Sequence, residues 1–141
     1  MIAIGSDGAG YNLKTAIAEH LKERGIEFKD FGTVSSEAVD YPLYAKKVAN
    51  AVTSGECELG ILCCGTGIGV SIAANKVKGV RCALCHDCFS AEAARQHNDA
   101  NIIALGERVI GVGNALKVVD TFLDTDFSNV ERHVRRVGMI E

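Results

Sequence analysis

The chain has 141 residues, 48% of them hydrophobic, which suits one globular domain over residues 1–141 and is too short for two. Its 15 basic and 18 acidic side chains give a net charge of -3, so no overall field would draw the protein to nucleic acid or to an anionic membrane.

Short apolar runs alternate with longer helical patterns along the chain. In chain order, strands are expected within 1–6, 26–32, 58–64, 79–85 and 101–106, and helices within 9–25, 41–55, 69–76 and 113–124, before a helical tail over about 128–141. In the first helix, Leu13, Ile17 and Leu21 share a face and predict its buried side, whereas Lys14 and Lys22 are expected to point outward. The alternation predicts a Rossmann-like three-layer α/β/α sandwich around a five-stranded parallel sheet, with strand order 2-1-3-4-5.

The amino terminus, MIAIGSDGAG, lacks a basic region and reaches Asp7 before any long apolar stretch, which argues against a signal peptide. No apolar run approaches the roughly 18 residues that a membrane span needs. We therefore expect a cytoplasmic protein. In that compartment the six cysteines are expected to be reduced: Cys57, Cys63, Cys64, Cys82, Cys85 and Cys88.

Two glycine-rich segments, GSDGAG (5–10) and CCGTGIG (63–69), lie at predicted carboxyl ends of strands, where open parallel sheets bind ligands. The second leads into a helix, so its backbone N–H groups and the positive helix end would face an anion or an oxyanion. The same glycines would also serve a tight turn without any ligand. Neither segment matches the G-x-G-x-x-G fingerprint or the P-loop, so a nucleotide is not indicated.

Two adjacent cysteines end the third predicted strand. Neighbouring strand residues point to opposite faces, so Cys63 should pack in the core and Cys64 should face the site. A thiol at a helix N-terminus has a lowered pKa and can act as a base or a nucleophile. A cysteine phosphatase would need an arginine where this chain has Val70, so proton transfer is the better use for Cys64.

A second cysteine pattern, C-x-x-C-x-x-C at 82–88, contains the C-x-x-C-H of haem attachment. On a buried strand, Cys82 and Cys85 would face opposite sides of the sheet and could not hold one metal. No fourth cysteine follows at iron–sulfur spacing. We therefore interpret these cysteines as small core residues rather than as a metal or haem site.

The histidines differ in their expected places. His20 is expected at the surface of its helix, and His86 in a loop without a clear partner. His97 lies between a helix and a strand, hence at the amino edge of the sheet, away from Cys64. If both act in one reaction, they most simply come from two subunits of a dimer, although His97 could instead cap a helix end.

The tail carries a cluster of basic residues. Arg132 and Arg136 stand four residues apart and share a helical face. Such a pair suits a phosphate, and it suits a solvated surface equally well.

Several separated motifs occur together: IGSD-x-AG at the start, VDYP at 39–42, CGTGIGVSIAANK at 64–76, RQHNDANIIALGERV at 95–109 and RH-x-x-RV in the tail. In this combination the chain resembles the type B ribose-5-phosphate isomerases and the related galactose-6-phosphate isomerases. The resemblance implies a Rossmann-like homodimer with active sites shared between subunits, and the sequence does not decide whether such dimers pair further into a tetramer. It also implies a sugar-phosphate isomerase of carbohydrate metabolism that converts ribose 5-phosphate and ribulose 5-phosphate through an enediolate, with no metal or organic cofactor.

The resemblance further implies roles for individual residues. Cys64 would move a proton between C2 and C1 of the sugar, and Thr66 with the neighbouring glycine backbone would hold the enediolate oxygens. His97, helped by Asp7, would open the furanose ring. The positions implied in binding the sugar and its phosphate are Gly8, Asp40, Tyr41, Gly65, Gly67, Ile68, Gly69, Asn98, Arg108, Arg132 and Arg136.

One position departs from the family's pattern, because Gly8 stands where the usual GSDHAG has a histidine. Loss of that side chain would remove a donor and would enlarge the pocket, which favours a longer substrate or a weaker activity. A hexose 6-phosphate isomerase of allose or galactose type and a non-catalytic sugar-phosphate-binding subunit therefore stand as alternatives.

Overall fold

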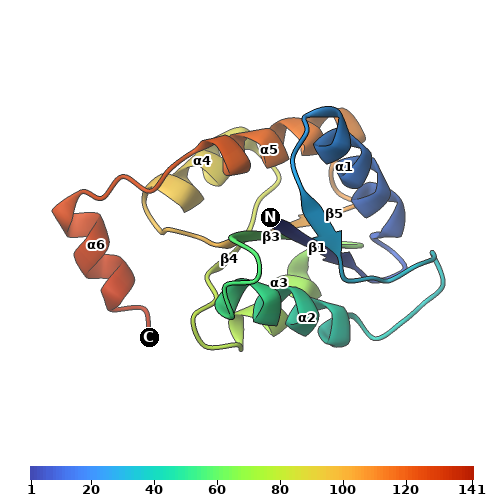
Figure 1. Ribbon diagram of the computed structural model, residues 1–141, viewed down its shortest axis with the longest axis horizontal. Coiled ribbons are helices and arrows are strands. Elements are labelled where there is room, and N and C mark those ends of the chain that lie inside the picture. The colour runs from blue at the N-terminus through green and yellow to red at the C-terminus, as the bar shows by residue number, and fades with distance from the viewer.

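The computed structural model describes residues 1–141 and contains five strands and six helices. In chain order they are β1 (Ile2–Ser6), α1 (Tyr11–Glu23), β2 (Phe28–Asp30), α2 (Tyr41–Thr53), β3 (Leu59–Cys64), α3 (Ile68–Asn75), β4 (Cys82–Leu84), α4 (Cys88–Gln96), β5 (Ile102–Gly106), α5 (Val112–Asp124) and α6 (Glu131–Gly138). All strands pair in parallel and helices cover both faces of the sheet (Figure 1), so the predicted Rossmann-like sandwich is confirmed. None of the helices combines the length and the apolar character that crossing a membrane requires.

The sheet has the order β2-β1-β3-β5-β4, so the predicted order is wrong in its last two strands. β5 is buried along its whole length and pairs with β3, from Gly60 beside Ile102 to Cys64 beside Gly106. β4 is only three residues long, has no fully buried residue and lies at the edge. A long apolar strand loses more solvent contact in the centre than a short, half-exposed one, which explains the exchange.

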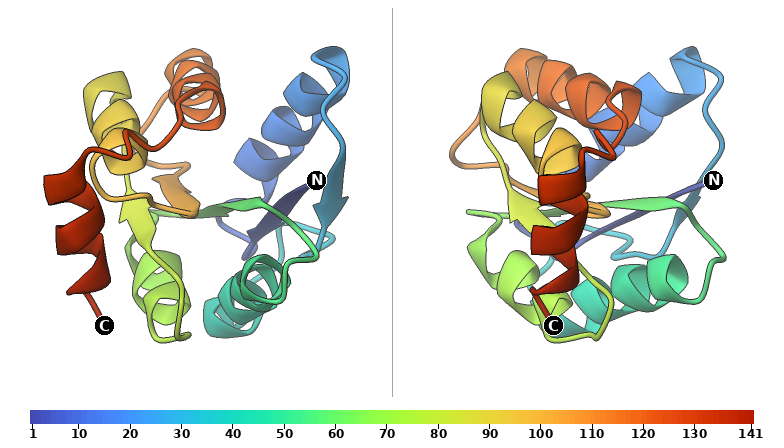
Figure 2. Two further views of the ribbon diagram at one scale, coloured as in Figure 1. Left: turned by 60° about the vertical axis from the view of Figure 1, so that its left-hand side comes forward. Right: turned by 90° about the vertical axis from the view of Figure 1, so that its left-hand side faces the viewer.

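Two apolar clusters form the core, one on each face of the sheet (Figure 2). On one face, α1, α4 and α5 contribute residues such as Ile17 and Phe122. On the other face, α2 and α3 contribute residues such as Val48 and Val70. Helix α6 stands outside these three layers, beyond the end of α4 (Figures 1 and 2).

Lys14 corrects the predicted pattern of α1. Its neighbours Leu13, Ile17 and Leu21 are buried as expected, but the Lys14 side chain is itself only 2% exposed. Its Nζ donates to Asp30 Oδ1 at 2.8 Å and to the Thr33 carbonyl at 2.5 Å. The prediction that Lys14 points outward is wrong because these acceptors, at the end of β2 and in the loop after it, satisfy the ammonium inside the protein.

We expect Lys14→Met to lower the free energy of unfolding by about 1–3 kcal/mol, because the Thr33 carbonyl and the Asp30 carboxylate lose their shared donor. Urea unfolding measures the change. Lys22→Met, on the exposed side of the same helix, is the matched control and should stay within about 0.5 kcal/mol of the wild type. Equal stabilities of the two variants would contradict a bridging role for Lys14.

Candidate functional site

The turn after β3 forms the centre of the candidate site. Cys64 is the last residue of β3, and its Sγ accepts a hydrogen bond from the Gly67 N–H at 3.0 Å. Gly67 has a φ of 79°, in the left-handed region that favours glycine, and it leads directly into α3. The exposed Thr66 accepts the Ile68 N–H on its Oγ1 at 3.1 Å. The sulfur of Cys64 thus lies at the amino end of a helix, as predicted.

Four backbone N–H groups stay free at this turn. The amides of Gly65, Thr66, Gly69 and Val70 make no hydrogen bond within the chain. Because such amides at a helix N-terminus attract negative charge, they are donors for an anion or for an oxygen on which charge develops.

The turns after β1 and β5 pack against the turn after β3. Gly10 lies so near it that a Cβ there would sit 2.5 Å from the Cys63 carbonyl oxygen and 2.6 Å from the Cys64 nitrogen. Arg108 donates its backbone N–H to the Gly65 carbonyl at 3.0 Å. Its guanidinium approaches the position of a Cβ on Gly65 to 3.6 Å. The structure therefore places Arg108 beside the glycine turn.

Residues from the amino ends of α1 and α2 surround the same turn. Asp7 Oδ1 accepts the Gly10 N–H at 3.0 Å, which orients the carboxylate at the end of β1. The Tyr41 ring lies against Gly69, where an added Cβ would come within 2.7 Å of it. Asp40, exposed and without a capping hydrogen bond, precedes Tyr41. Asp7, Asp40 and Tyr41 are thus brought to one edge of the sheet.

Gly8 leaves no open space at this edge. A Cβ there would overlap the Glu37 carbonyl oxygen and would lie 2.7 Å from the Ser36 carbonyl oxygen. The loop between β2 and α2 therefore fills the place of a side chain. The expectation that Gly8 enlarges the pocket is wrong.

His97 and Asn98 lie elsewhere. His97 caps the carboxyl end of α4 and precedes β5, whereas Cys64 ends β3, so the parallel sheet separates the two residues as predicted. Both His97 and Asn98 are exposed. Asp7 stays with Cys64, and one chain alone does not bring Asp7 to His97.

His133 joins His97 in a second group of residues. The two rings lie with their centroids 4.7 Å apart, and His133 Nδ1 shares a 2.6 Å hydrogen bond with Ser128 Oγ. Burial, followed by the charges of Arg132, His97 and Arg136, lowers the pKa of His133. The sequence marked His133 only as part of RH-x-x-RV, since its burial depends on where α6 docks.

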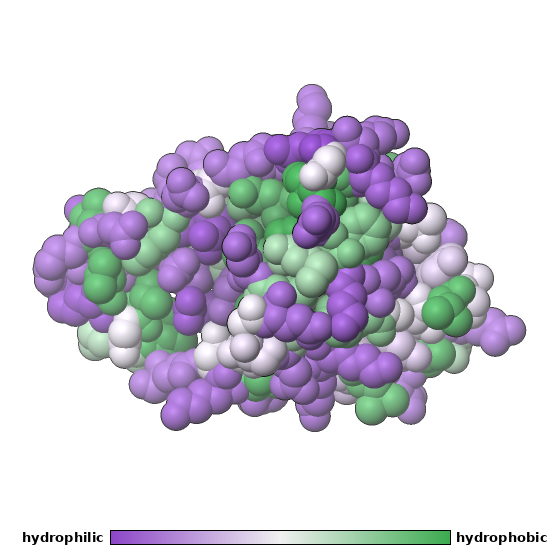
Figure 3. Space-filling view, in the orientation of Figure 1, coloured by the Kyte–Doolittle hydropathy of each residue, from purple (hydrophilic) through white to green (hydrophobic).

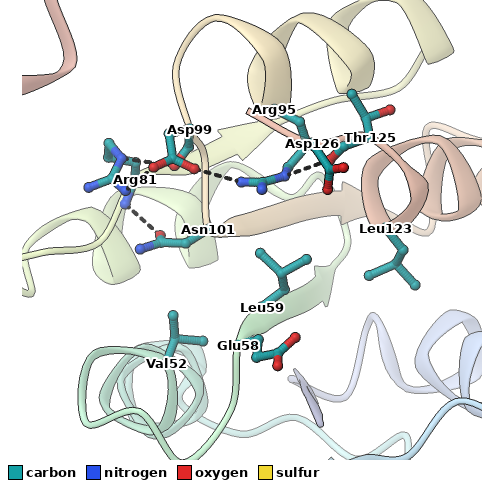
Figure 4. Close-up of a pocket in the computed structure, with 10 residues that line it drawn as sticks. All are labelled: Val52, Glu58, Leu59, Arg81, Arg95, Asp99, Asn101, Leu123, Thr125 and Asp126. Atoms are coloured by element: carbon teal, nitrogen blue, oxygen red, sulfur yellow. Dashed lines mark hydrogen bonds and ion pairs between the residues drawn. The ribbon is translucent and has the colours of Figure 1, made fainter. Parts of the chain in front are cut away.

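A polar cluster supports the loop that carries His97 (Figure 4). Asp99 has a φ of 46° and holds Arg95 at 3.1 Å and Arg81 at 3.4 Å. These residues line a cavity of about 420 Å³ that contains none of the predicted site residues. Because both arginines are already paired with Asp99, we interpret the cluster as a support for the loop rather than as an anion site. The i, i+4 spacing of Arg95 and Asp99 was the available sequence signal.

Two other histidines have partners in the chain. His20 shares a 2.8 Å hydrogen bond with Asp120 at the surface between α1 and α5. The Gly106 N–H donates to His86 Nε2 at 2.9 Å, so the expectation that His86 lacks a clear partner is wrong. His86 therefore fixes the loop after β4 to the end of β5.

Three other thiols pack against the faces of the sheet. Cys82 packs on one face of the sheet and Cys85 on the opposite face, as predicted from strand alternation. Burial raises the pKa of Cys82 to about 12 and that of Cys85 to about 11, and it raises the pKa of Cys63 as well. These three thiols therefore remain protonated near neutral pH.

The fold and the site define a Rossmann-like protein with a cysteine and free helix amides suited to proton transfer on an anionic substrate. Residues 2–140 match the model of a family described as Ribose/Galactose Isomerase, and the chain belongs to that family. It is 50% identical over 139 residues to ribose-5-phosphate isomerase B of Escherichia coli, covering 99% of this chain and 93% of the relative. It is 54% identical over 140 residues, with the same coverages, to a putative sugar phosphate isomerase of Bacillus subtilis. The solved structure of Clostridium thermocellum ribose-5-phosphate isomerase B matches with a TM-score of 0.97 and 58% identity, covering 99% of this chain and 93% of the other.

Alkylation of the native protein should separate the cysteines by burial. At pH 8, iodoacetamide should modify the exposed Cys88 while Cys63 and Cys85 stay unmodified, because burial hinders access and only about one Cys85 thiol in a thousand would be ionised. Peptide mass spectrometry reads each site, and labelling in urea, where all cysteines should react, is the control. Reaction of Cys85 as fast as Cys88 would contradict the assigned burial.

Proposed function

We propose that this chain is an aldose–ketose isomerase that interconverts ribose 5-phosphate and ribulose 5-phosphate through an enediolate, without a metal or an organic cofactor. The observation that carries the proposal is Cys64, whose Sγ lies 3.0 Å from the Gly67 nitrogen in the turn that holds the free amides. The similarity to ribose-5-phosphate isomerases extends over 99% of the chain and supports the same reaction.

Cys64 is the base of the proposed reaction. It takes the proton from C2 of the open-chain aldose and returns it to C1, while a hydroxyl proton moves from O2 to O1, so no atom is gained or lost. The negative charge that develops on the enediolate oxygens is stabilised by the free amides of Thr66, Gly69 and Val70. Because the neighbouring carbonyl already acidifies C2, stabilising this charge supplies the remaining catalysis.

The second group of residues completes the site. His97 opens the furanose ring with the help of Asp7, and Asn98 binds a sugar hydroxyl. Arg132 and Arg136 receive the phosphate; both are exposed and have no carboxylate partner. In contrast, Arg135 on the same helix is already paired with Glu131 at 3.0 Å.

Substrate binding at the Cys64 edge involves side chains from three turns. Arg108 lies beside Gly65 and contributes positive charge. Asp40 and Tyr41 line the sugar pocket, with the Tyr41 ring against the glycine turn. Ile68, at the start of α3, contributes its exposed side chain to the same sugar pocket.

The functional unit in this proposal is a homodimer. Cys64 and His97 lie at opposite edges of one sheet, so two-fold symmetry is the simplest way to bring one of each into a site. Exposed apolar side chains lie near both groups, with Ile72 on α3 and Val134 and Met139 in the C-terminal segment. Apolar and charged groups are mixed on the surface of the protruding α6 (Figures 1 and 3), in keeping with an interface that also binds phosphate.

The cellular setting follows from the reaction. The isomerase acts in pentose phosphate metabolism in the cytoplasm, where six cysteines without a disulfide remain reduced.

Replacing Cys64 tests the assigned base. Cys64→Ala should fold and bind inorganic phosphate but should lose turnover of ribose 5-phosphate by about three orders of magnitude or more, because no other thiol lies at the amino end of α3. A steady-state assay with EDTA present measures kcat/KM, and Cys88→Ala, which removes an exposed thiol, is the control expected to retain it. Unchanged turnover in Cys64→Ala would refute the mechanism, and a wild type that binds phosphate without turnover would favour a non-catalytic binding subunit.

Mixing two inactive variants tests whether the sites are shared. A mixed dimer of Cys64→Ala and His97→Asn has one intact site, so complete exchange of equal amounts should restore about a quarter of the wild-type activity. Native mass spectrometry confirms that subunits exchange. A double variant carrying both changes, mixed with Cys64→Ala, should restore none. Absence of recovery in verified mixed dimers would show that each chain builds its own site.

A further inference from the structure

The loop between β2 and α2 is seated on Gly8 by direct backbone contact. Gly8 is buried, and the carbonyl groups of Ser36 and Glu37 occupy the position of its missing side chain. Residues 34–39 make only one hydrogen bond, from the Glu37 N–H to Ser35 Oγ at 3.3 Å. Packing on Gly8, rather than hydrogen bonding, therefore holds this part of the loop.

This loop borders the site that contains Cys64. Ala9, the residue after Gly8, has its Cβ 3.6 Å from the Cβ position of Gly65 in the glycine turn. At its other end the loop leads into Tyr41, whose ring lies against Gly69. Ser36 and Glu37 thus lie on Gly8, between two residues that each contact the turn after β3 or the start of α3, and we refer to this Ser36–Glu37 segment as the wall.

We propose that Gly8 limits the size of the sugar: by letting the Ser36–Glu37 backbone close on the turn after β1, it fits the site to tetrose and pentose phosphates and rejects hexose 6-phosphates. This inference rests on the proposed isomerase function. Backbone is a firmer barrier than the end of a long side chain, because moving it displaces several residues at once. An extra carbon that cannot be accommodated costs about tenfold or more in kcat/KM.

The wild-type protein supplies the first test. Rates with erythrose 4-phosphate, ribose 5-phosphate and allose 6-phosphate should show a kcat/KM for the hexose at least about tenfold below that for the pentose. Equal values for pentose and hexose would overturn the inference while leaving the isomerase function intact. Absence of turnover with all three sugars would overturn both.

Gly8→Ala supplies the second test, because its Cβ must push the Ser36–Glu37 backbone away. The ratio of hexose to pentose kcat/KM should rise about tenfold. Gly113→Ala, where nothing lies within 4 Å of an added Cβ, is the control and should leave the ratio unchanged. A folded Gly8→Ala protein with an unchanged ratio would overturn the inference.

A variant of the loop keeps the test independent of the turn after β1. The double change Ser36→Gly and Glu37→Gly loosens the loop while leaving Gly8 in place. It should raise the ratio in the same direction as Gly8→Ala, and no rise would count against the wall.

Discussion

Direct backbone packing among the turns after β1, β3 and β5 determines where the residues of the candidate site lie. Gly10 rests on Cys63, and Gly106 rests on Thr66, where an added Cβ would lie 2.5 Å from the carbonyl carbon. No side chain can separate these segments, so the turn after β3 is fixed from two sides. Its free amides therefore keep their direction before any substrate arrives, which is the preorganisation that charge stabilisation requires.

The same architecture explains why one chain holds only part of the catalytic set. In a parallel sheet every strand ends at the same edge, so Cys64 and Asp7 lie at that edge, while a residue before a strand such as His97 lies at the far edge. The arginines of α6 lie on the same side of the molecule as His97, because His133 of α6 packs against the His97 ring. Two groups of residues at opposite edges of one sheet are what a symmetric pair of subunits can combine.

Local patterns in the sequence predicted the layers and the division between Cys63 and Cys64, because alternation along a strand is a local property. They did not predict the order of β4 and β5, since both runs are apolar. The two strands differ in that β5 pairs with a strand on each side and β4 pairs with one strand only, and this depends on contacts between distant segments. Lys14 was misplaced for a related reason. Its acceptors lie 16 and 19 residues away, and helical spacing carries no information about them.

The candidate residues around Cys64 could be predicted from motifs, but the structural role of Gly8 could not. A glycine in the sequence shows that a side chain is missing, and only the structure shows that the Ser36–Glu37 backbone takes its place. Lys14 holds the start of the same loop at Thr33, so the unit of β1 and α1 fixes the loop at two points. Because these contacts are separate from the packing of Gly10 on Cys63, a change at Gly8 can move the sugar-facing wall and leave the cysteine turn intact. The selection of substrate size and the chemistry of proton transfer are thus supported by different contacts of one βα unit, which lets one vary without loss of the other.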